Sequence, residues 1–114
     1  MELHSAVFYT RDIDSVEKFY HHTLGLEIEY RQQDAFISFI FSNNVRLGIK
    51  MAVEEREIPG AQTIFVKVDD IDRWYEKAEQ LKLRIRKKLV VESWGTNFSI
   101  LDPDGNKVQF VSAK

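Results

Sequence analysis

Cysteine is absent from this sequence of 114 residues, which excludes a disulfide framework and a thiolate metal site. Long hydrophobic runs are absent too, and the apolar stretches fall far short of the roughly 20 residues that a membrane span requires. The excess of either charge is small, since the formal net charge is −2 and both signs are interspersed. We therefore expect neither a membrane-embedded protein nor a nucleic-acid-binding protein, which would carry a basic stripe.

The composition is that of an ordinary globular chain, with 44% hydrophobic and 30% charged residues. A chain of this length can bury one core, so we expect residues 1–114 to form a single domain. Met1 is followed by the polar residues Glu2 and His4 rather than by a basic and apolar leader. This start predicts a cytoplasmic location.

The chain contains two copies of one pattern. Asp12-Ile13-Asp14 returns as Asp70-Ile71-Asp72, 58 positions later. The later segments Leu47-Gly48-Ile49 and Val108-Gln109-Phe110 match at an offset of 61, so the second copy is about three residues longer. A duplicated unit of this size predicts paired modules with a site between them. We assign module one to residues 1–51, a linker to residues 52–60, and module two to residues 61–114.

Both copies predict the same order of elements, βαβββ, from their alternating and helical periodicities. In module one we expect a helix that starts at Asp12 or Asp14 and is closed by Gly25, with strands at 5–10, 27–31, 36–41 and 45–50. In module two we expect a helix at 71–81, with strands at 63–68, 84–91, 97–101 and 107–111. The fold class is therefore α+β, with two sheets that are each covered on one face by a helix.

Side chains alternate along a strand, so each strand has one face under a helix and one free face. Under the helices we expect the strand residues Ala6, Phe8, Ile64, Val66 and Val68, with Trp74, Ala78 and Leu81 facing them from the second helix. The opposite faces are predicted to line a shared cleft through Ser5, Val7, Tyr9, Phe36, Ser38, Ile40, Arg46, Gly48, Lys50, Thr63, Phe65, Lys67, Ser99, Lys107, Gln109 and Val111. No carboxylate belongs to this set, because we expect Glu27, Glu29 and Glu92 to be exposed, and we predict no catalytic residue.

Several motifs in order carry a family resemblance: Asp12-Ile13, Lys18-Phe19-Tyr20, Leu24-Gly25-Leu26, Val68-Asp69-Asp70-Ile71, Trp94-Gly95 and Asp102-Pro103-Asp104-Gly105-Asn106. Together they resemble the vicinal oxygen chelate superfamily, which includes glyoxalase I, extradiol dioxygenases, fosfomycin-resistance enzymes and bleomycin-resistance proteins. The resemblance covers nearly the whole chain. It implies paired βαβββ modules that form a cleft, very often within a homodimer.

The resemblance also implies four metal-ligand positions, which relatives that are metal enzymes fill with histidine or glutamate. In this chain they are Ser5, Gly48, Thr63 and Gln109. None is an imidazole or a carboxylate, so we expect no metal and no cofactor. His4 is adjacent to one position, but a shift of one residue along a strand turns a side chain to the other face unless a bulge intervenes. His21 and His22 are consecutive on a helix and are expected to be solvated.

A small-molecule site is nevertheless predicted on the cleft-facing strands. Its cations would attract an anion, unless they form ion pairs with surface glutamates. Its aromatic residues, and Trp94 beside Gly95, would stack on a flat ligand, unless they belong to the core or to a dimer interface. The predicted ligand-binding residues are Ser5, Val7, Tyr9, Phe36, Ser38, Arg46, Gly48, Lys50, Thr63, Phe65, Lys67, Trp94 and Gln109.

Three functions follow as hypotheses. The first is metal-free binding of an anionic or neutral planar molecule, as in drug or metabolite sequestration and antibiotic resistance; the cationic residues disfavour bleomycin itself, which is basic. The second is a metal-dependent lyase, isomerase or dioxygenase that uses His4. The third is a ligand-free subunit that binds a protein partner.

Overall fold

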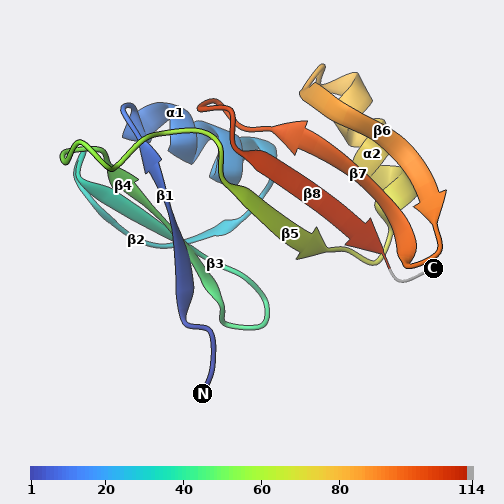
Figure 1. Ribbon diagram of the computed structural model, residues 1–114, viewed down its shortest axis with the longest axis horizontal. Coiled ribbons are helices and arrows are strands. Elements are labelled where there is room, and N and C mark those ends of the chain that lie inside the picture. The colour runs from blue at the N-terminus through green and yellow to red at the C-terminus, as the bar shows by residue number, and fades with distance from the viewer. Residues whose placement is uncertain (113–114) are drawn as a thin grey trace. The chain divides into compact units, whose positions relative to one another are not determined.

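The computed structural model describes residues 1–112. The chain divides after Gly60 into two compact units, unit 1 from Met1 to Gly60 and unit 2 from Ala61 onward. Figure 1 shows both units, and each has one four-stranded sheet and its own helical segment.

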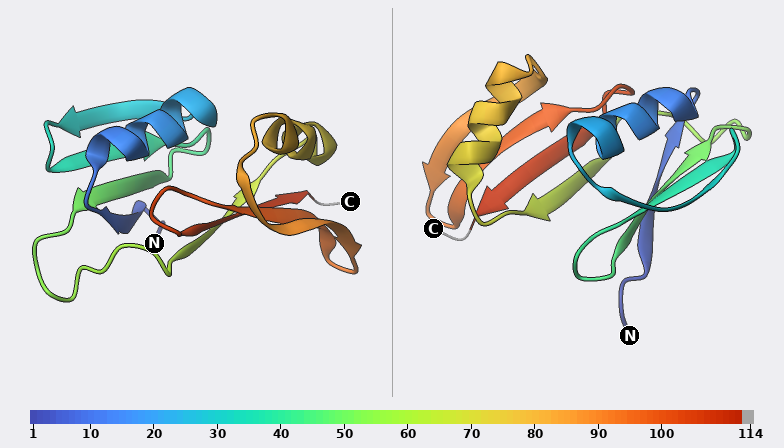
Figure 2. Two further views of the ribbon diagram at one scale, coloured as in Figure 1. Left: turned by 90° about the horizontal axis from the view of Figure 1, so that it is seen from above. Right: turned by 180° about the vertical axis from the view of Figure 1, so that it is seen from behind.

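Unit 1 contains β1 (Ser5–Thr10), α1 (Ile13–Glu17), η1 (Lys18–Thr23), β2 (Glu27–Gln32), β3 (Phe36–Ile40) and β4 (Arg46–Met51). Its strands lie in the order β1-β4-β3-β2. Strands β1 and β4 are parallel, whereas the other neighbours are antiparallel. The helical segment therefore carries the chain from β1 across one face of the sheet (Figure 2).

Unit 2 repeats this plan with β5 (Thr63–Lys67), α2 (Ile71–Gln80), β6 (Arg84–Glu92), β7 (Gly95–Leu101) and β8 (Lys107–Ser112). Its strands lie in the order β5-β8-β7-β6, and β5 and β8 are parallel. The prediction of an α+β fold built from two βαβββ units is confirmed, with element ends that differ by one or two residues from those expected.

An aspartate begins each helix. The Asp12 carboxylate accepts a hydrogen bond from the backbone N–H of Ser15 at 3.2 Å, and the Asp70 carboxylate accepts one from Arg73 at 3.3 Å. Each bond satisfies one of the free N–H groups at a helix start. The repeated aspartates of the sequence are thus helix caps.

The first helix differs from the continuous α-helix that we predicted. After Glu17 it widens into the π-helix η1, in which Leu24 donates its backbone N–H to the carbonyl of Phe19, five residues earlier. Gly25 then adopts a positive φ of 80° and ends the helix, as predicted. A single widened turn of this kind changes the hydrogen bonding but leaves the apolar spacing nearly helical, so periodicity does not reveal it.

The core of each unit lies between its sheet and its helix. In unit 1, Tyr20 packs against Phe39 with ring centroids 5.5 Å apart, and both side chains are fully buried. In unit 2, Phe98 stacks on Phe110 at 4.8 Å, and Trp74 stacks on the same Phe110 at 5.3 Å. Burying each such ring stabilises the fold by about 1.5–3 kcal/mol.

Most residues predicted to lie under the helices are buried or half-buried there, but Leu81 is an exception. We expected it to face the sheet, whereas its side chain is 50% exposed. It is the C-cap of α2, one residue beyond the last helical position, where the chain turns away. Within residues 1–112, no helix combines the length and the apolar character needed to cross a lipid bilayer.

Candidate functional site

The helix-free face of each sheet, called here its open face, carries the residues predicted for the site. In unit 1, pairing across β1, β4 and β3 arranges them in three rows: Ser5–Arg46–Ile40, Val7–Gly48–Ser38 and Tyr9–Lys50–Phe36. Paired residues of neighbouring strands point to the same side of a sheet. Unit 1 therefore places these nine residues on the same face of its sheet, as the alternation predicted.

Gly48 lies beneath the ring of Phe36. A Cβ atom at Gly48 would lie 2.5 Å from Cζ of Phe36, closer than any real Cβ contact. Phe36 in turn stacks on Tyr30 of β2, with centroids 5.9 Å apart. The space above this glycine is thus filled by the ring of Phe36, from the neighbouring strand β3.

Glu29 is exposed, as we expected, but its carboxylate lies on the open face of unit 1, where we predicted none. A β-bulge between Ile28 and Tyr30 brings Glu29 and Tyr30 to the same place opposite Ser38. The carboxylate accepts a hydrogen bond from the Ser38 hydroxyl and one from the Arg46 guanidinium, each at 2.9 Å. These bonds, first that of Ser38 and then that of Arg46, lower the pKa of Glu29.

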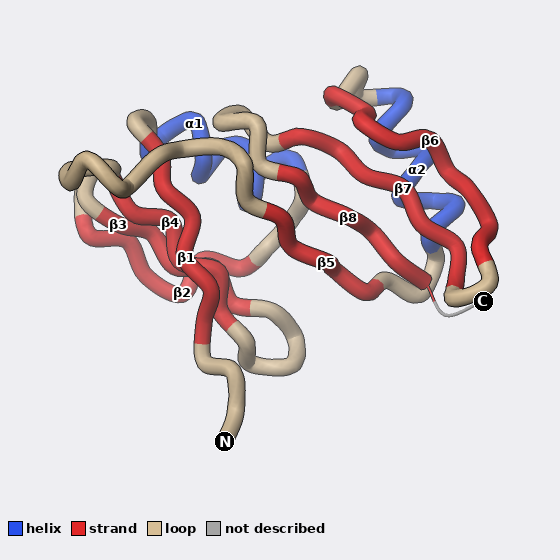
Figure 3. Tube along the Cα trace, in the orientation of Figure 1, coloured by secondary structure: helices blue, strands red, loops and turns tan. Residues whose placement is uncertain are grey.

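Lys50 is bound to the linker. Its ammonium donates to both carboxylate oxygens of Glu57, at 2.7 and 2.8 Å. The Glu57 side chain is only 5% exposed and also accepts the backbone N–H groups of Val53 and Glu54. The Lys50 bond and these two backbone bonds lower the pKa of Glu57 to about 2. Figure 3 shows the linker as a long loop between β4 and β5.

In unit 2 the corresponding rows are Thr63–Lys107–Leu101, Phe65–Gln109–Ser99 and Lys67–Val111–Asn97. The predicted residues Thr63, Phe65, Lys67 and Gln109 therefore share the open face of this unit. Phe65 is 62% exposed and has no aromatic neighbour within the described residues. Gln109, next to it on β8, is buried.

A chain of polar side chains supports Gln109. Its amide nitrogen donates to Oδ1 of Asn97 at 3.0 Å, and the ammonium of Lys87 donates to the same oxygen at 2.9 Å. The Asn97 amide nitrogen donates to the carboxylate of Glu92 at 2.7 Å. This bond, followed by the one from Lys87, lowers the pKa of Glu92.

Sequence reasoning missed most of this network of hydrogen-bonded side chains. Asn97 begins the predicted strand 97–101 and shares the parity of Ser99, which is the signal that would have placed it on the open face. Lys87 and Glu92 carry no such signal, because β6 is irregular near Lys87 and the pairing register shifts twice.

Ser99, the last residue of the row Phe65–Gln109–Ser99, has an unsatisfied hydroxyl. Its side chain is 1% exposed, and its Oγ has no hydrogen-bond partner within residues 1–112. Its counterpart in unit 1, Ser38, donates to Glu29. Buried hydroxyls almost always have a partner, so the Ser99 hydroxyl is a candidate to donate to a molecule bound on this face.

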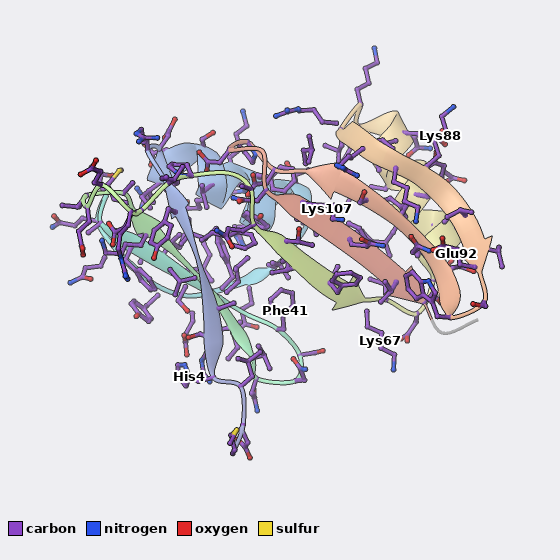
Figure 4. The ribbon with its side chains drawn as sticks, viewed as in Figure 1. His4, Phe41, Lys67, Lys88, Glu92 and Lys107 are labelled. Atoms are coloured by element: carbon purple, nitrogen blue, oxygen red, sulfur yellow. The ribbon has the colours of Figure 1, made fainter. Side chains whose placement is uncertain are left out.

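Two of the four predicted cations are paired and two are not. Arg46 is held by Glu29 and Lys50 by Glu57. Lys67 and Lys107 form no ion pair with any described residue. Figure 4 shows them at opposite ends of the unit 2 sheet, Lys107 at the start of β8 and Lys67 at the end of β5.

The remaining candidates lie outside these rows. Trp94 is in the turn between β6 and β7 and is 53% exposed. His4 precedes β1, is exposed, and has Nδ1 3.2 Å from Oγ of Ser5. His21 is not simply solvated as expected, because its Nδ1 lies 2.7 Å from the carbonyl oxygen of Leu26 and its ring contacts that of His22.

The residues do not fit the metal ion that the fold suggests. The four positions that the resemblance predicts as ligands offer two hydroxyls, a glycine and an amide, and the space over the glycine holds the Phe36 ring. Among residues 1–112, no three histidine, aspartate or glutamate side chains gather in a way that could hold a metal ion. Divalent ions such as Zn²⁺ require imidazole, thiolate or carboxylate ligands.

Comparison with known proteins agrees with the fold. No curated protein matches the chain. A solved structure of a member of the glyoxalase/bleomycin resistance protein/dioxygenase superfamily from Sphaerobacter thermophilus is 24% identical, with a TM-score of 0.84 over 98% of this chain and 97% of that chain. Lactoylglutathione lyase from Agrobacterium tumefaciens is 21% identical, with a TM-score of 0.82 over 97% and 92%. TioX from Micromonospora sp. ML1 is 14% identical, with a TM-score of 0.82 over the whole of both chains.

A sequence model of one protein family assigns the chain to a family, which the structural similarities alone do not. The model described as Glyoxalase/Bleomycin resistance protein/Dioxygenase superfamily matches residues 2–110, which is nearly the entire chain. The match agrees with the paired βαβββ units and with the helix-capping aspartates at the start of both helices. This chain therefore belongs to the glyoxalase/bleomycin resistance protein/dioxygenase superfamily.

Proposed function

We propose that this protein binds a planar small molecule on its open faces without a metal ion, and that it acts by sequestration rather than by catalysis. The observation that carries the proposal is the chemistry of the four ligand positions, Ser5, Gly48, Thr63 and Gln109. None offers an anionic or imidazole ligand, and at Gly48 an aromatic ring fills the space of a side chain.

Exposed apolar and aromatic side chains on the open faces support a binding role. Phe65 is 62% exposed, Tyr30 52% and Val7 43%. Apolar surface with a few oriented polar groups is typical of small-molecule sites. Affinity then comes from stacking and from a few hydrogen bonds.

The ion pairs change the expected ligand. Because Glu29 and Glu57 neutralise Arg46 and Lys50, unit 1 has no free cation among the residues predicted to bind an anion. On unit 1 the attraction for an anion is therefore weaker than the sequence suggested, and a neutral planar ligand is favoured there.

Metal analysis tests the proposal. We would incubate the purified protein with Ni²⁺, Zn²⁺, Mn²⁺ or Fe²⁺, dialyse it, and measure bound metal by elemental analysis, expecting far less than one ion per chain. Stoichiometric metal would overturn the proposal. The H4A variant then identifies the alternative, since loss of that metal in H4A would point to the metal-dependent enzyme that uses His4.

Ligand binding is tested separately by thermal shift against a panel of planar metabolites and antibiotics. A rise in Tm with at least one neutral planar compound is expected. The absence of any shift would favour the ligand-free, partner-binding alternative. We also propose a homodimer, as the family resemblance suggests, and light scattering at a mass of one chain would contradict it.

A further inference from the structure

On the open face of unit 2, two charged side chains fix the orientation of the Gln109 amide. Glu92 and Lys87 act on it through Asn97, to which all three are hydrogen-bonded. Glu92 is ionised and can only accept hydrogen bonds, so the Asn97 side chain must turn its NH₂ group toward it. Lys87 can only donate, and it donates to Oδ1 of Asn97. Oδ1 is therefore an acceptor, and Gln109 must present its own NH₂ group to that oxygen.

The consequence is a directed acceptor at residue 109. With one N–H bound to Asn97, the Gln109 amide is held in one orientation, which fixes where its carbonyl oxygen and its second N–H are offered to another molecule. An amide that was free to rotate could offer either its oxygen or its nitrogen at one place. The Gln109 amide is instead held by Asn97, which is itself held by Glu92 and Lys87. At the position of its carbonyl oxygen, Gln109 therefore selects for a hydrogen-bond donor.

Its neighbours in the same row add an apolar surface and a second polar group. Phe65 pairs with Gln109 from β5, and its 62% exposed ring has no aromatic partner in the described part of the chain. Ser99 pairs with Gln109 from β7, and its buried hydroxyl lacks a partner among residues 1–112. The row thus offers, in order, a ring to stack on, an acceptor and an unsatisfied hydroxyl.

We propose that the open face of unit 2 recognises a neutral planar ligand whose edge carries an N–H donor beside a carbonyl oxygen, as an aromatic carboxamide does. The ring stacks on Phe65, the N–H donates to the Gln109 carbonyl oxygen, and the ligand carbonyl is the acceptor that Ser99 lacks. A carboxylate is disfavoured because it would bring oxygen against the Gln109 oxygen without a proton between them. This inference deepens the proposed function and rests on it.

Three probes of one shape separate the chemistries: 2-naphthamide, methyl 2-naphthoate and 2-naphthoate. The amide has a donor and an acceptor, the ester has only acceptors, and the acid is an anion at pH 7. We would measure their dissociation constants by NMR titration of the full chain. The amide is expected to bind about tenfold more tightly than the ester, the gain that one well-placed hydrogen bond gives, and more tightly than the anion.

Variants then show which residues cause the difference in affinity between the amide and the ester. Q109L keeps the size of the side chain but removes the acceptor, so the amide should lose its advantage over the ester. Q80L, the same change at an exposed position of α2, should retain it. F65A should weaken the amide and the ester by similar factors, and S99A should weaken both because both carry a carbonyl. Should Q109L fail to fold, Q109M provides the same test with an unbranched side chain.

Equal binding of the amide and the ester to the unaltered protein would overturn the inference, and so would tighter binding of the anion. An unchanged ratio of the amide and ester dissociation constants in Q109L would also overturn the inference. Q109M takes the place of Q109L if that variant does not fold. If none of the three probes binds, the inference fails while the proposed function is still decided by the metal analysis and the wider panel. Stoichiometric metal would instead overturn the proposed function itself.

Discussion

The ring of Phe36 takes the place of the side chain that Gly48 lacks. Its Cζ atom lies 2.5 Å from where a Cβ at residue 48 would be. In unit 2 the two corresponding positions, each 61 residues later, are Asn97 and Gln109, whose amides are hydrogen-bonded at 3.0 Å. One repeated pair of positions therefore gives an aromatic ring over a glycine in one unit and an amide pair in the other.

This relationship predicts that G48A is destabilising only while Phe36 is present. The added methyl group would collide with the ring, and overpacking of this kind lowers the free energy of unfolding by about 1–3 kcal/mol. In the F36A background the collision is gone, and alanine in a strand is favoured over glycine by roughly 0.5–1 kcal/mol. Urea denaturation of both pairs of proteins measures the coupling. An equal loss in the two backgrounds would contradict the packing described here.

The Lys50–Glu57 pair predicts a stability change in acid. The folded-state pKa of Glu57 is about 2, below the ordinary value of 4.5. A carboxyl with a lowered pKa stabilises the fold fully above its ordinary pKa, and this contribution disappears as the pH falls toward the folded-state value. Tm should therefore fall between pH 4.5 and pH 2, and E57Q should have a lower Tm at pH 7 and a flatter profile in that range. E55Q, a change at an exposed linker residue, should follow the unaltered protein.

Arg31 bonds three carboxylates, and only one of them should matter to stability. Its guanidinium lies 3.0 Å from Glu17, 2.8 Å from Asp14 and 2.9 Å from Asp34. Glu17 is 27% exposed, whereas Asp14 and Asp34 are 82% and 83% exposed. Exposed pairs contribute little because water screens them, so D14N and D34N should each cost less than about 0.5 kcal/mol and E17Q about 1 kcal/mol. The reverse order in chemical denaturation would refute this ranking.

Asp12 and Asp70 should contribute equally as helix caps. Replacing such a residue by alanine costs about 1 kcal/mol, so D12A and D70A should each lower the midpoint of urea unfolding. D69A is the matched control, because Asp69 is exposed and precedes the cap. A loss in D69A as large as that in D70A would show that charge, rather than capping, is responsible.

Local patterns were sufficient for the architecture. The repeated aspartates marked both helix starts, and alternation along the strands placed Ser5, Gly48, Thr63 and Gln109 on the open faces. These features depend on residues close in sequence, so the sequence contains them directly. The π-helix η1 and the exposure of Leu81 were missed because each depends on where a helical hydrogen-bond pattern changes, which apolar spacing does not record.

The sequence by itself determined the two βαβββ units, because periodicity and spacing are properties of the chain, and its family resemblance implied the four ligand positions. Only the tertiary structure decided which charges are neutralised and how Gln109 is oriented. Those features depend on a bulge at Glu29, a register shift in β6 and a linker loop that brings Glu57 to Lys50. Each brings together groups that no local pattern relates, since pairing across strands and loops is set by packing rather than by neighbouring residues.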